Sequence, residues 1–139
     1  MARMTSVLCF SGVLLFLLGL VTGFAIPALK SPRIGLSAHL AATQMGVALI
    51  AFGFLWERLT FWNGWSAPLA HVLWISFYIV WLAILMGAFW GTGKAMPIAG
   101  AGHVAAKWQE RVTLVPLALG SFGGFGVVLM MLIQWKWNA

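Results

Sequence analysis

The sequence predicts an all-α integral membrane protein, a bundle of four transmembrane helices. Of its 139 residues, 63% are hydrophobic and only 7% are charged, whereas a soluble domain of this size carries about 25% charged residues. So few charges cannot cover a surface that faces water. Four apolar stretches account for most of the chain, and each is long enough to cross about 30 Å of hydrocarbon.

The predicted spans are separated by segments that break helices or carry polar residues. Pro27 and Pro32 interrupt the helical pattern after the first span. The second span ends in WERLTFWNGWS, and the long polar segment GTGKAMPIAGAGHVAAKWQERV precedes the last span. We predict a single domain over residues 1–139, with spans at about 6–26, 38–55, 67–90 and 113–134.

Charge and cysteine content limit the possible partners. The net charge of +6 is scattered without a cationic run, so we expect no nucleic acid partner and expect the basic residues to contact lipid headgroups. Cys9 is the single cysteine, which excludes an internal disulfide. Basic residues divide almost equally between the two membrane sides, which leaves the orientation open. So short a chain buries little by itself, and we expect a homo-oligomer.

The two acidic residues argue against one class of membrane protein. Glu57 and Glu110 lie at the edges of spans or in loops. Proton-coupled transporters of similar size need a carboxylate inside the membrane, so that class is disfavoured. The GTGK segment is no phosphate-binding loop, because Ala95 follows where such a loop requires Ser or Thr.

Three histidines are candidate metal ligands. His39 lies in the first turn of the second span, His71 near the start of the third span on the opposite side, and His103 in the last loop. Because the spans are antiparallel, His39 and His71 should be about 20 Å apart along the membrane normal, so they cannot bind both faces of one haem. His39 is therefore a candidate lone axial ligand that leaves the other face of an iron open.

The alternative is that His39 only caps its helix or hydrogen-bonds a carbonyl, and the sequence leaves this open. Thr43 and Gly46 share the helix face of His39 and make it small and slightly polar, suited to a porphyrin edge. Small residues also recur at every fourth position on other spans. They either allow close helix packing or leave room for a flat cofactor.

The third span adds an aromatic face. Trp74, Tyr78 and Trp81 share it. Because this span runs back toward the side of His39, Trp81 and Gly87 should reach the depth of that histidine. An apolar pocket there would suit a small aromatic substrate that enters from lipid. The alternative is a face that packs against another helix or faces lipid.

The segments ALKSPRIGLSAHL (28–40) and GAFWGTGKAMPIAGAGH (87–103) resemble the hydroxylaminobenzene mutase family. The chain is more distantly similar to styrene oxide isomerase, a four-span membrane enzyme. The resemblance covers most of the chain. It implies an isomerase that converts hydroxylaminobenzene to 2-aminophenol by moving oxygen from nitrogen to the ortho ring carbon. It also implies a multi-pass protein of the bacterial inner membrane that acts in nitroaromatic degradation.

The resemblance implies a site as well. In styrene oxide isomerase a histidine that opens the second span binds haem b in a trimer, and His39 matches it. Ferric haem iron held by His39 would then act as a Lewis acid on the N–O oxygen. We expect Met96 and Pro97 to help shape the pocket. The remaining expected site residues are Gly46 and Gly87 next to the cofactor, and Thr43, Tyr78 and Trp81 next to the substrate.

The chain departs from the isomerase pattern at its polar positions. Met45, Val80 and Ile84 stand at or near the places where that pattern has two asparagines and a tyrosine. The nearest candidates to replace these donors are Thr43, Gln44 and Tyr78. Gln44 is the weakest of the three, because it lies about 140° round the helix from His39.

The leading interpretation is a membrane-embedded, haem-dependent isomerase that acts on arylhydroxylamines. Two alternatives remain. One is a non-catalytic four-helix membrane protein, such as an assembly factor or a small-solute channel. The other is a haem electron-transfer protein, which would require two axial histidines at matching depths.

Overall fold

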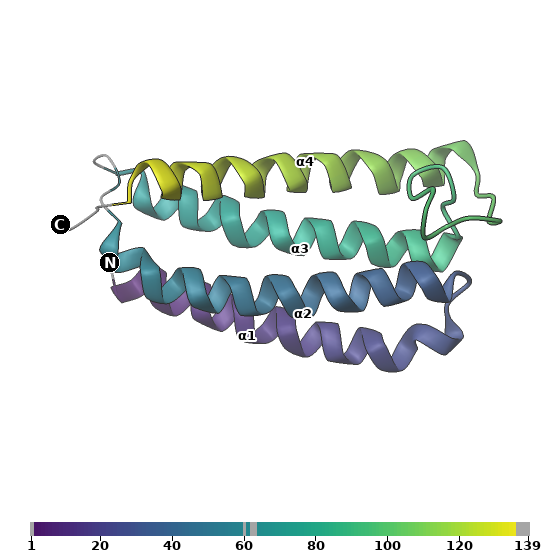
Figure 1. Cartoon of the computed structure of the whole chain (residues 1–139), viewed down its shortest axis with the longest axis horizontal. Helices are drawn as coiled ribbons and strands as arrows, with labels where there is room; N and C mark the ends of the chain where they lie inside the picture. The colour runs from purple at the N-terminus through teal and green to yellow at the C-terminus, as the bar shows by residue number, and fades with distance from the viewer. Residues whose placement is uncertain (1, 60, 62–63, 136–139) are drawn as a thin grey trace.

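The computed structural model describes residues 2–59, 61 and 64–135, which form a bundle of long helices (Figure 1). Two short 3₁₀ segments, η1 (Ile26–Ala28) and η2 (Trp56–Arg58), follow the first two long helices. The long helices are α1 (Ala2–Ala25), α2 (Pro32–Leu55), α3 (Ser66–Trp90) and α4 (Lys107–Ile133).

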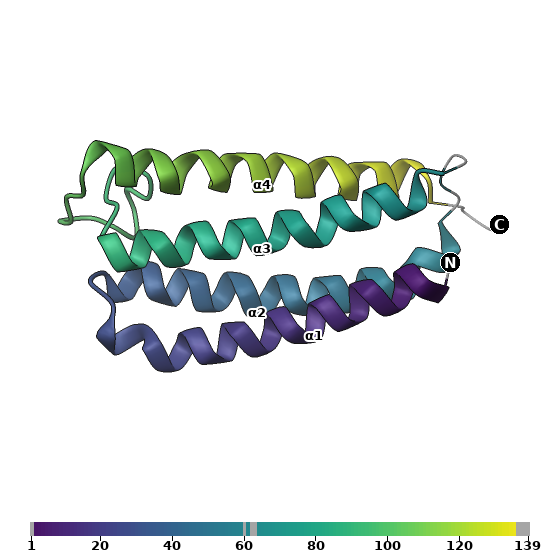
Figure 2. The same ribbon diagram turned by 180° about the vertical axis from the view of Figure 1, so that it is seen from behind.

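The helices form two antiparallel pairs, α1 with α2 and α3 with α4 (Figures 1 and 2). α3 also packs against α2 and, less extensively, against α1. Among the described helices, α4 packs only against α3. The turn between α1 and α2 and the loop between α3 and α4 lie at the same end of the bundle (Figure 1). We call this end, residues 26–31 and 91–106, the loop end.

All four long helices are long and apolar enough to cross a membrane. Only 22% to 33% of the residues in their most apolar windows are buried inside the bundle. Large apolar side chains point outward instead, among them Phe24 and Phe122, which are 86% and 75% exposed. Such an outer surface suits hydrocarbon and not water. The predicted fold, an all-α bundle of four membrane-spanning helices, is confirmed.

All four helices begin before the predicted spans, and α2 and α4 do so by six residues each. α2 begins at Pro32, because proline has a fixed φ that fits the first helical turn and lacks an N–H that this turn does not use. His39 therefore lies in the third turn of α2, and the prediction that it lies in the first turn is wrong. α4 begins at Lys107, after Ala106 donates its N–H to Gln109 Oε1 at 2.9 Å.

Backbone hydrogen bonds hold the loop end together. α3 ends where Gly91 takes a left-handed conformation, with φ 69° and ψ 56°, and donates its N–H to the Gly87 carbonyl at 2.8 Å. Ser31 donates its N–H to the Ala88 carbonyl at 3.0 Å. The turn between α1 and α2 is thereby fixed to the last turn of α3.

Glycines let α1 and α2 approach closely near their middles. A Cβ added to Gly46 would lie 2.7 Å from the Phe16 nitrogen and 2.8 Å from the Gly12 carbonyl oxygen. Both distances are shorter than van der Waals contact, so only glycine fits. In lipid, close backbone approach of this kind supplies much of the attraction between helices. At these positions the small residues serve helix packing.

We predict that Gly46→Ala destabilises the bundle. The added methyl group meets backbone that cannot move aside, and overpacking of this kind costs about 1–3 kcal/mol. The thermal midpoint in detergent should fall by about 5 °C or more. Gly126→Ala is the matched control, because a Cβ at Gly126 in α4 meets no atom within 4 Å. Equal midpoints for the two variants would contradict the packing role of Gly46.

Candidate functional site

His39 lies on the side of α2 that faces α1 and is half-buried there. Its Nδ1 is 2.7 Å from the Gly19 carbonyl oxygen. A carbonyl only accepts hydrogen bonds, so Nδ1 carries the proton and donates it. Gly23, one turn further along α1, leaves room for the ring, since a Cβ there would lie 2.9 Å from Nδ1.

This bond determines what the other ring nitrogen can do. In a neutral imidazole with its proton on Nδ1, the Nε2 atom carries the free lone pair. Across the described chain, His39 Nε2 has no hydrogen-bond partner. Histidines that bind metals commonly donate the other N–H to a backbone carbonyl, which fixes the tautomer and the ring orientation. The hydrogen bond from His39 to a carbonyl, which the sequence offered as an alternative to metal binding, is present. It leaves Nε2 available as a ligand.

The other two histidines do not join His39. His71 is exposed near the start of α3, and its Nδ1 accepts a hydrogen bond from Trp74 Nε1 at 3.0 Å. His103 lies at the loop end, with Nε2 3.0 Å from the Lys30 carbonyl oxygen. Within the described ranges, no group of three or more His, Cys, Asp or Glu side chains could hold a metal ion. His39 is thus suited to be a single axial ligand to a group that supplies its own remaining ligands.

The aromatic face of α3 packs against α1. The rings of Trp74, Tyr78 and Trp81 meet edge to face, with centroids 5.7 Å and 6.5 Å apart. Tyr78 donates its hydroxyl to the Ser11 carbonyl at 2.8 Å, and Trp81 Nε1 donates to Thr22 Oγ1 at 3.2 Å. Trp74, Tyr78 and Trp81 thus form a face that packs against another helix. This is the alternative to a substrate pocket that the sequence left open.

Trp81 and His39 reach the same turn of α1 from different helices. Thr22, the partner of Trp81, lies within one turn of Gly19, the partner of His39. Trp81 therefore lies near the depth of His39, as its position on α3 predicts. Through these two bonds α2 and α3 both hold the part of α1 that orients the imidazole.

Thr43 and Gly46 continue the α2 face beyond His39, but each is engaged with protein. Thr43 Oγ1 lies 3.0 Å from the carbonyl oxygens of His39 and Leu40, so its hydroxyl is bonded within α2. Gly46 packs on the α1 backbone. Gly87 faces α4 and the loop before it, where a Cβ would meet Thr92, Thr113 and Met96. The structure does not bring Gly46 and Gly87 to one space beside His39, and their role next to a cofactor stays a prediction.

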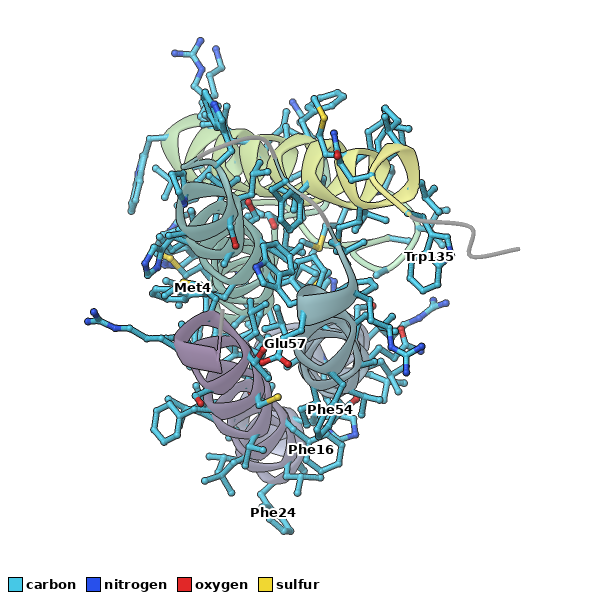
Figure 3. All side chains as sticks on the ribbon, turned by 90° about the vertical axis from the view of Figure 1, so that its left-hand side faces the viewer. Met4, Phe16, Phe24, Phe54, Glu57 and Trp135 are labelled. Atoms are coloured by element: carbon cyan, nitrogen blue, oxygen red, sulfur yellow. The ribbon has the colours of Figure 1, made fainter. Side chains whose placement is uncertain are left out.

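An open groove runs along the outer side of α1 and α2, next to the His39 turn. It has a volume of about 370 Å³ and is lined by Phe16, Thr43, Gln44 and Val47. Figure 3, which looks along the bundle from the end opposite the loop end, shows Phe16 on the outer side of this helix pair together with Phe54. Gln44 is exposed on the groove wall.

The loop between α3 and α4 is organised by an acidic residue that sequence reasoning assigned no role. Glu110 is 9% exposed, and its carboxylate accepts the N–H of Lys94 at 3.2 Å and of Ala95 at 2.7 Å. The loop then turns back through a bond from the Gly100 N–H to the Met96 carbonyl at 2.7 Å. An acid in the first turn of a helix, after a glycine-rich loop with free N–H groups, is the signal that could have identified it.

Polar atoms without partners gather around the loop end. The hydroxyls of Ser31, Thr92 and Thr113 and the Nδ1 of His103 are buried and find no hydrogen-bond partner among the described residues. Thr92 and Thr113 both adjoin Gly87. Ordered water commonly satisfies groups of this kind. The interior near the loop end therefore contains polar groups that are not paired within the described protein.

Comparison with known proteins shows which family the chain belongs to. The family model described as styrene oxide isomerase matches residues 4–135. Hydroxylaminobenzene mutase HabB of Ectopseudomonas oleovorans is 39% identical over 125 residues, which cover 89% of this chain and 75% of that protein. Hydroxylaminobenzene mutase HabA of the same organism is 40% identical over 110 residues, covering 78% of this chain and 82% of that protein. No solved structure matches the chain significantly.

The fold and these matches define a four-helix membrane isomerase. The chain belongs to the styrene oxide isomerase family. The resemblance found in segments 28–40 and 87–103 is thereby confirmed. The interpretation as a non-catalytic assembly factor or channel is wrong, since the family and both relatives are named as isomerases or mutases.

We predict that Glu110→Gln loosens the loop between α3 and α4. A carboxylate offers two acceptor oxygens to Lys94 and Ala95, whereas an amide offers one and turns its NH₂ toward the other N–H. Tryptic cleavage after Lys94, followed by mass spectrometry, should become severalfold faster, because a segment held by fewer hydrogen bonds opens more often.

Glu57→Gln is the control for this experiment. Glu57 is the other acid of the chain; it is exposed at η2 and accepts a hydrogen bond from Thr5 at 3.3 Å. Its replacement should leave cleavage after Lys94 unchanged. Unchanged cleavage in Glu110→Gln as well would show that the carboxylate does not hold the loop.

Proposed function

We propose that this chain isomerises arylhydroxylamines to 2-aminophenols inside the membrane, with hydroxylaminobenzene as the model substrate and haem b held by His39. The name shared by both relatives supports the substrate class. The single observation that supports the cofactor is the imidazole of His39, with Nδ1–H bonded to Gly19 and Nε2 unengaged.

The proposed reaction is an internal rearrangement. The N–O bond of the substrate breaks, a C–O bond forms at the ortho ring carbon, and that carbon loses a proton while the nitrogen gains one, so that the ring regains aromaticity and the amine forms. Substrate and product are isomers, so no oxidant or reductant is consumed. Ferric haem iron, when bound, supplies a Lewis acid for the N–O oxygen.

The chain's own residues hold and orient the groups that react. His39 would hold the haem through Nε2, while the Gly19 carbonyl fixes the plane of its ring. We assign Tyr78 and Trp81 to positioning, because their polar atoms hold α1 through Ser11 and Thr22. The apolar surroundings limit the access of water. Water would otherwise attack the electron-poor substrate that remains after the N–O bond breaks.

The proposal extends to assembly and location. The outer faces of the helices are apolar, and His39 Nε2 has no hydrogen-bond partner among the described residues. We propose a homotrimer in the bacterial inner membrane, as the resemblance implies, in which a neighbouring copy and lipid enclose the cofactor. The substrate, a small aromatic molecule, would partition into the same apolar region.

We predict that the purified protein shows a haem Soret band and forms 2-aminophenol from hydroxylaminobenzene. His39→Ala removes the only proposed ligand, so both the band and the activity should be lost. His71→Ala is the control and should keep both, because His71 is exposed near the start of α3. Haem content is measured by absorbance and product by chromatography.

Two outcomes would contradict this proposal. Activity in a colourless preparation would exclude the role of haem. A six-coordinate low-spin spectrum with no activity would favour electron transfer, since two strong protein ligands leave no open position on the iron.

A further inference from the structure

The groove on the outer side of α1 and α2 contains a polar group that nothing in the fold uses. Gln44 lies near the middle of α2 (Pro32–Leu55), with its side chain exposed. An amide carries two N–H donors and one carbonyl acceptor, and along the described chain none of them has a partner. The middle of a membrane-spanning helix offers no water to satisfy them, so an unpaired amide there is costly.

The groove is shallow and open on its outer side, with a volume of about 370 Å³. Its lining combines apolar walls with a polar group, as small-molecule sites do. Phe16 provides an aromatic wall and Val47 an aliphatic one, while Gln44 provides the free amide. The Thr43 hydroxyl also lines the groove but is bonded within α2. Gln44 is therefore the polar side chain left to fix the orientation of a ligand whose polar part is small.

The other candidate donors are already bonded within the protein. The Thr43 hydroxyl is bonded to carbonyls of its own helix. The Tyr78 hydroxyl is bonded to Ser11, and Trp81 Nε1 is bonded to Thr22. Gln44, which the helical wheel makes the weakest of these candidates, is therefore the one whose polar atoms have no partner among the described residues. The groove extends round α2 from Thr43, close to the face of His39, to Gln44, about 140° from it.

We infer that Gln44 binds the hydroxylamino group of the substrate in this groove. The inference rests on the proposed function and adds a specificity-determining residue to it. The Gln44 carbonyl accepts a hydrogen bond from the N–H or O–H of the substrate, and its NH₂ donates to the substrate oxygen. The ring lies between Phe16 and Val47.

This arrangement selects one class of ligand. A neutral arene with adjacent N–H and O–H groups satisfies both sides of the amide. An epoxide offers only an acceptor, and an aniline lacks the oxygen. A site that hydrogen-bonds two substrate groups rejects analogues that lack one of them, because its own polar group is then left unpaired.

The test compares Gln44→Met with the unchanged enzyme. Methionine keeps the length of glutamine but has no amide. The KM for hydroxylaminobenzene should rise about three- to tenfold, with kcat within about twofold and with the Soret band and oligomeric size unchanged. Gln44→Asn keeps an amide on a shorter side chain. Its KM should lie between the values of the unchanged enzyme and of Gln44→Met. Leu119→Met, at an exposed position of α4, is the control and should keep the original KM.

A binding measurement separates this inference from the proposed function. His39→Ala should not turn over the substrate, so calorimetric titration of that variant with hydroxylaminobenzene measures binding alone. Adding Gln44→Met to it should weaken binding by the same factor. This result would support the role of Gln44 even if His39→Ala showed that haem is not required.

Two results would overturn the inference. One is an unchanged KM together with unchanged binding. The other is that Gln44→Met loses the oligomer while each folded chain still binds the substrate as before. That result would mean that the amide forms a contact between copies of the chain.

Discussion

The arrangement of this site depends on one hydrogen bond between two helices, from His39 Nδ1 to the Gly19 carbonyl. Within α1 that carbonyl already accepts the N–H of residue 23, and its second lone pair serves the imidazole. The bond forms only because residues 19 and 23 have no side chains, as a Cβ on either would meet α2. Close glycine packing thus fixes a ring orientation, and the ring orientation leaves Nε2 free for a ligand.

α3 connects the two halves of the bundle and stabilises this geometry. Its aromatic face holds α1 by two side-chain hydrogen bonds, and its last turn holds the segment between α1 and α2. The long loop that follows α3 is in turn held by a carboxylate at the start of α4. The imidazole is therefore positioned by contacts from three helices, although it bonds directly to only one other helix.

The sequence predicted the fold well because four long apolar runs have few alternatives in lipid. It also singled out His39, since the other two histidines lie at an opposite end or in a loop. It placed His39 too near the start of its helix. Pro32 was expected to interrupt the helical pattern, whereas it is the first residue of α2. Gln44 is the weakest of the candidate donors in the sequence for a different reason. Helical periodicity gives the direction of a side chain, whereas only packing shows whether its polar atoms already have partners.

The position of α4 has a consequence for its outer surface. Among the described helices α4 meets only α3, so α3 lies between that surface and the hydrogen bond from His39 to Gly19. A substitution there can suit different lipids or neighbours while the packing of α1 on α2 stays as it is.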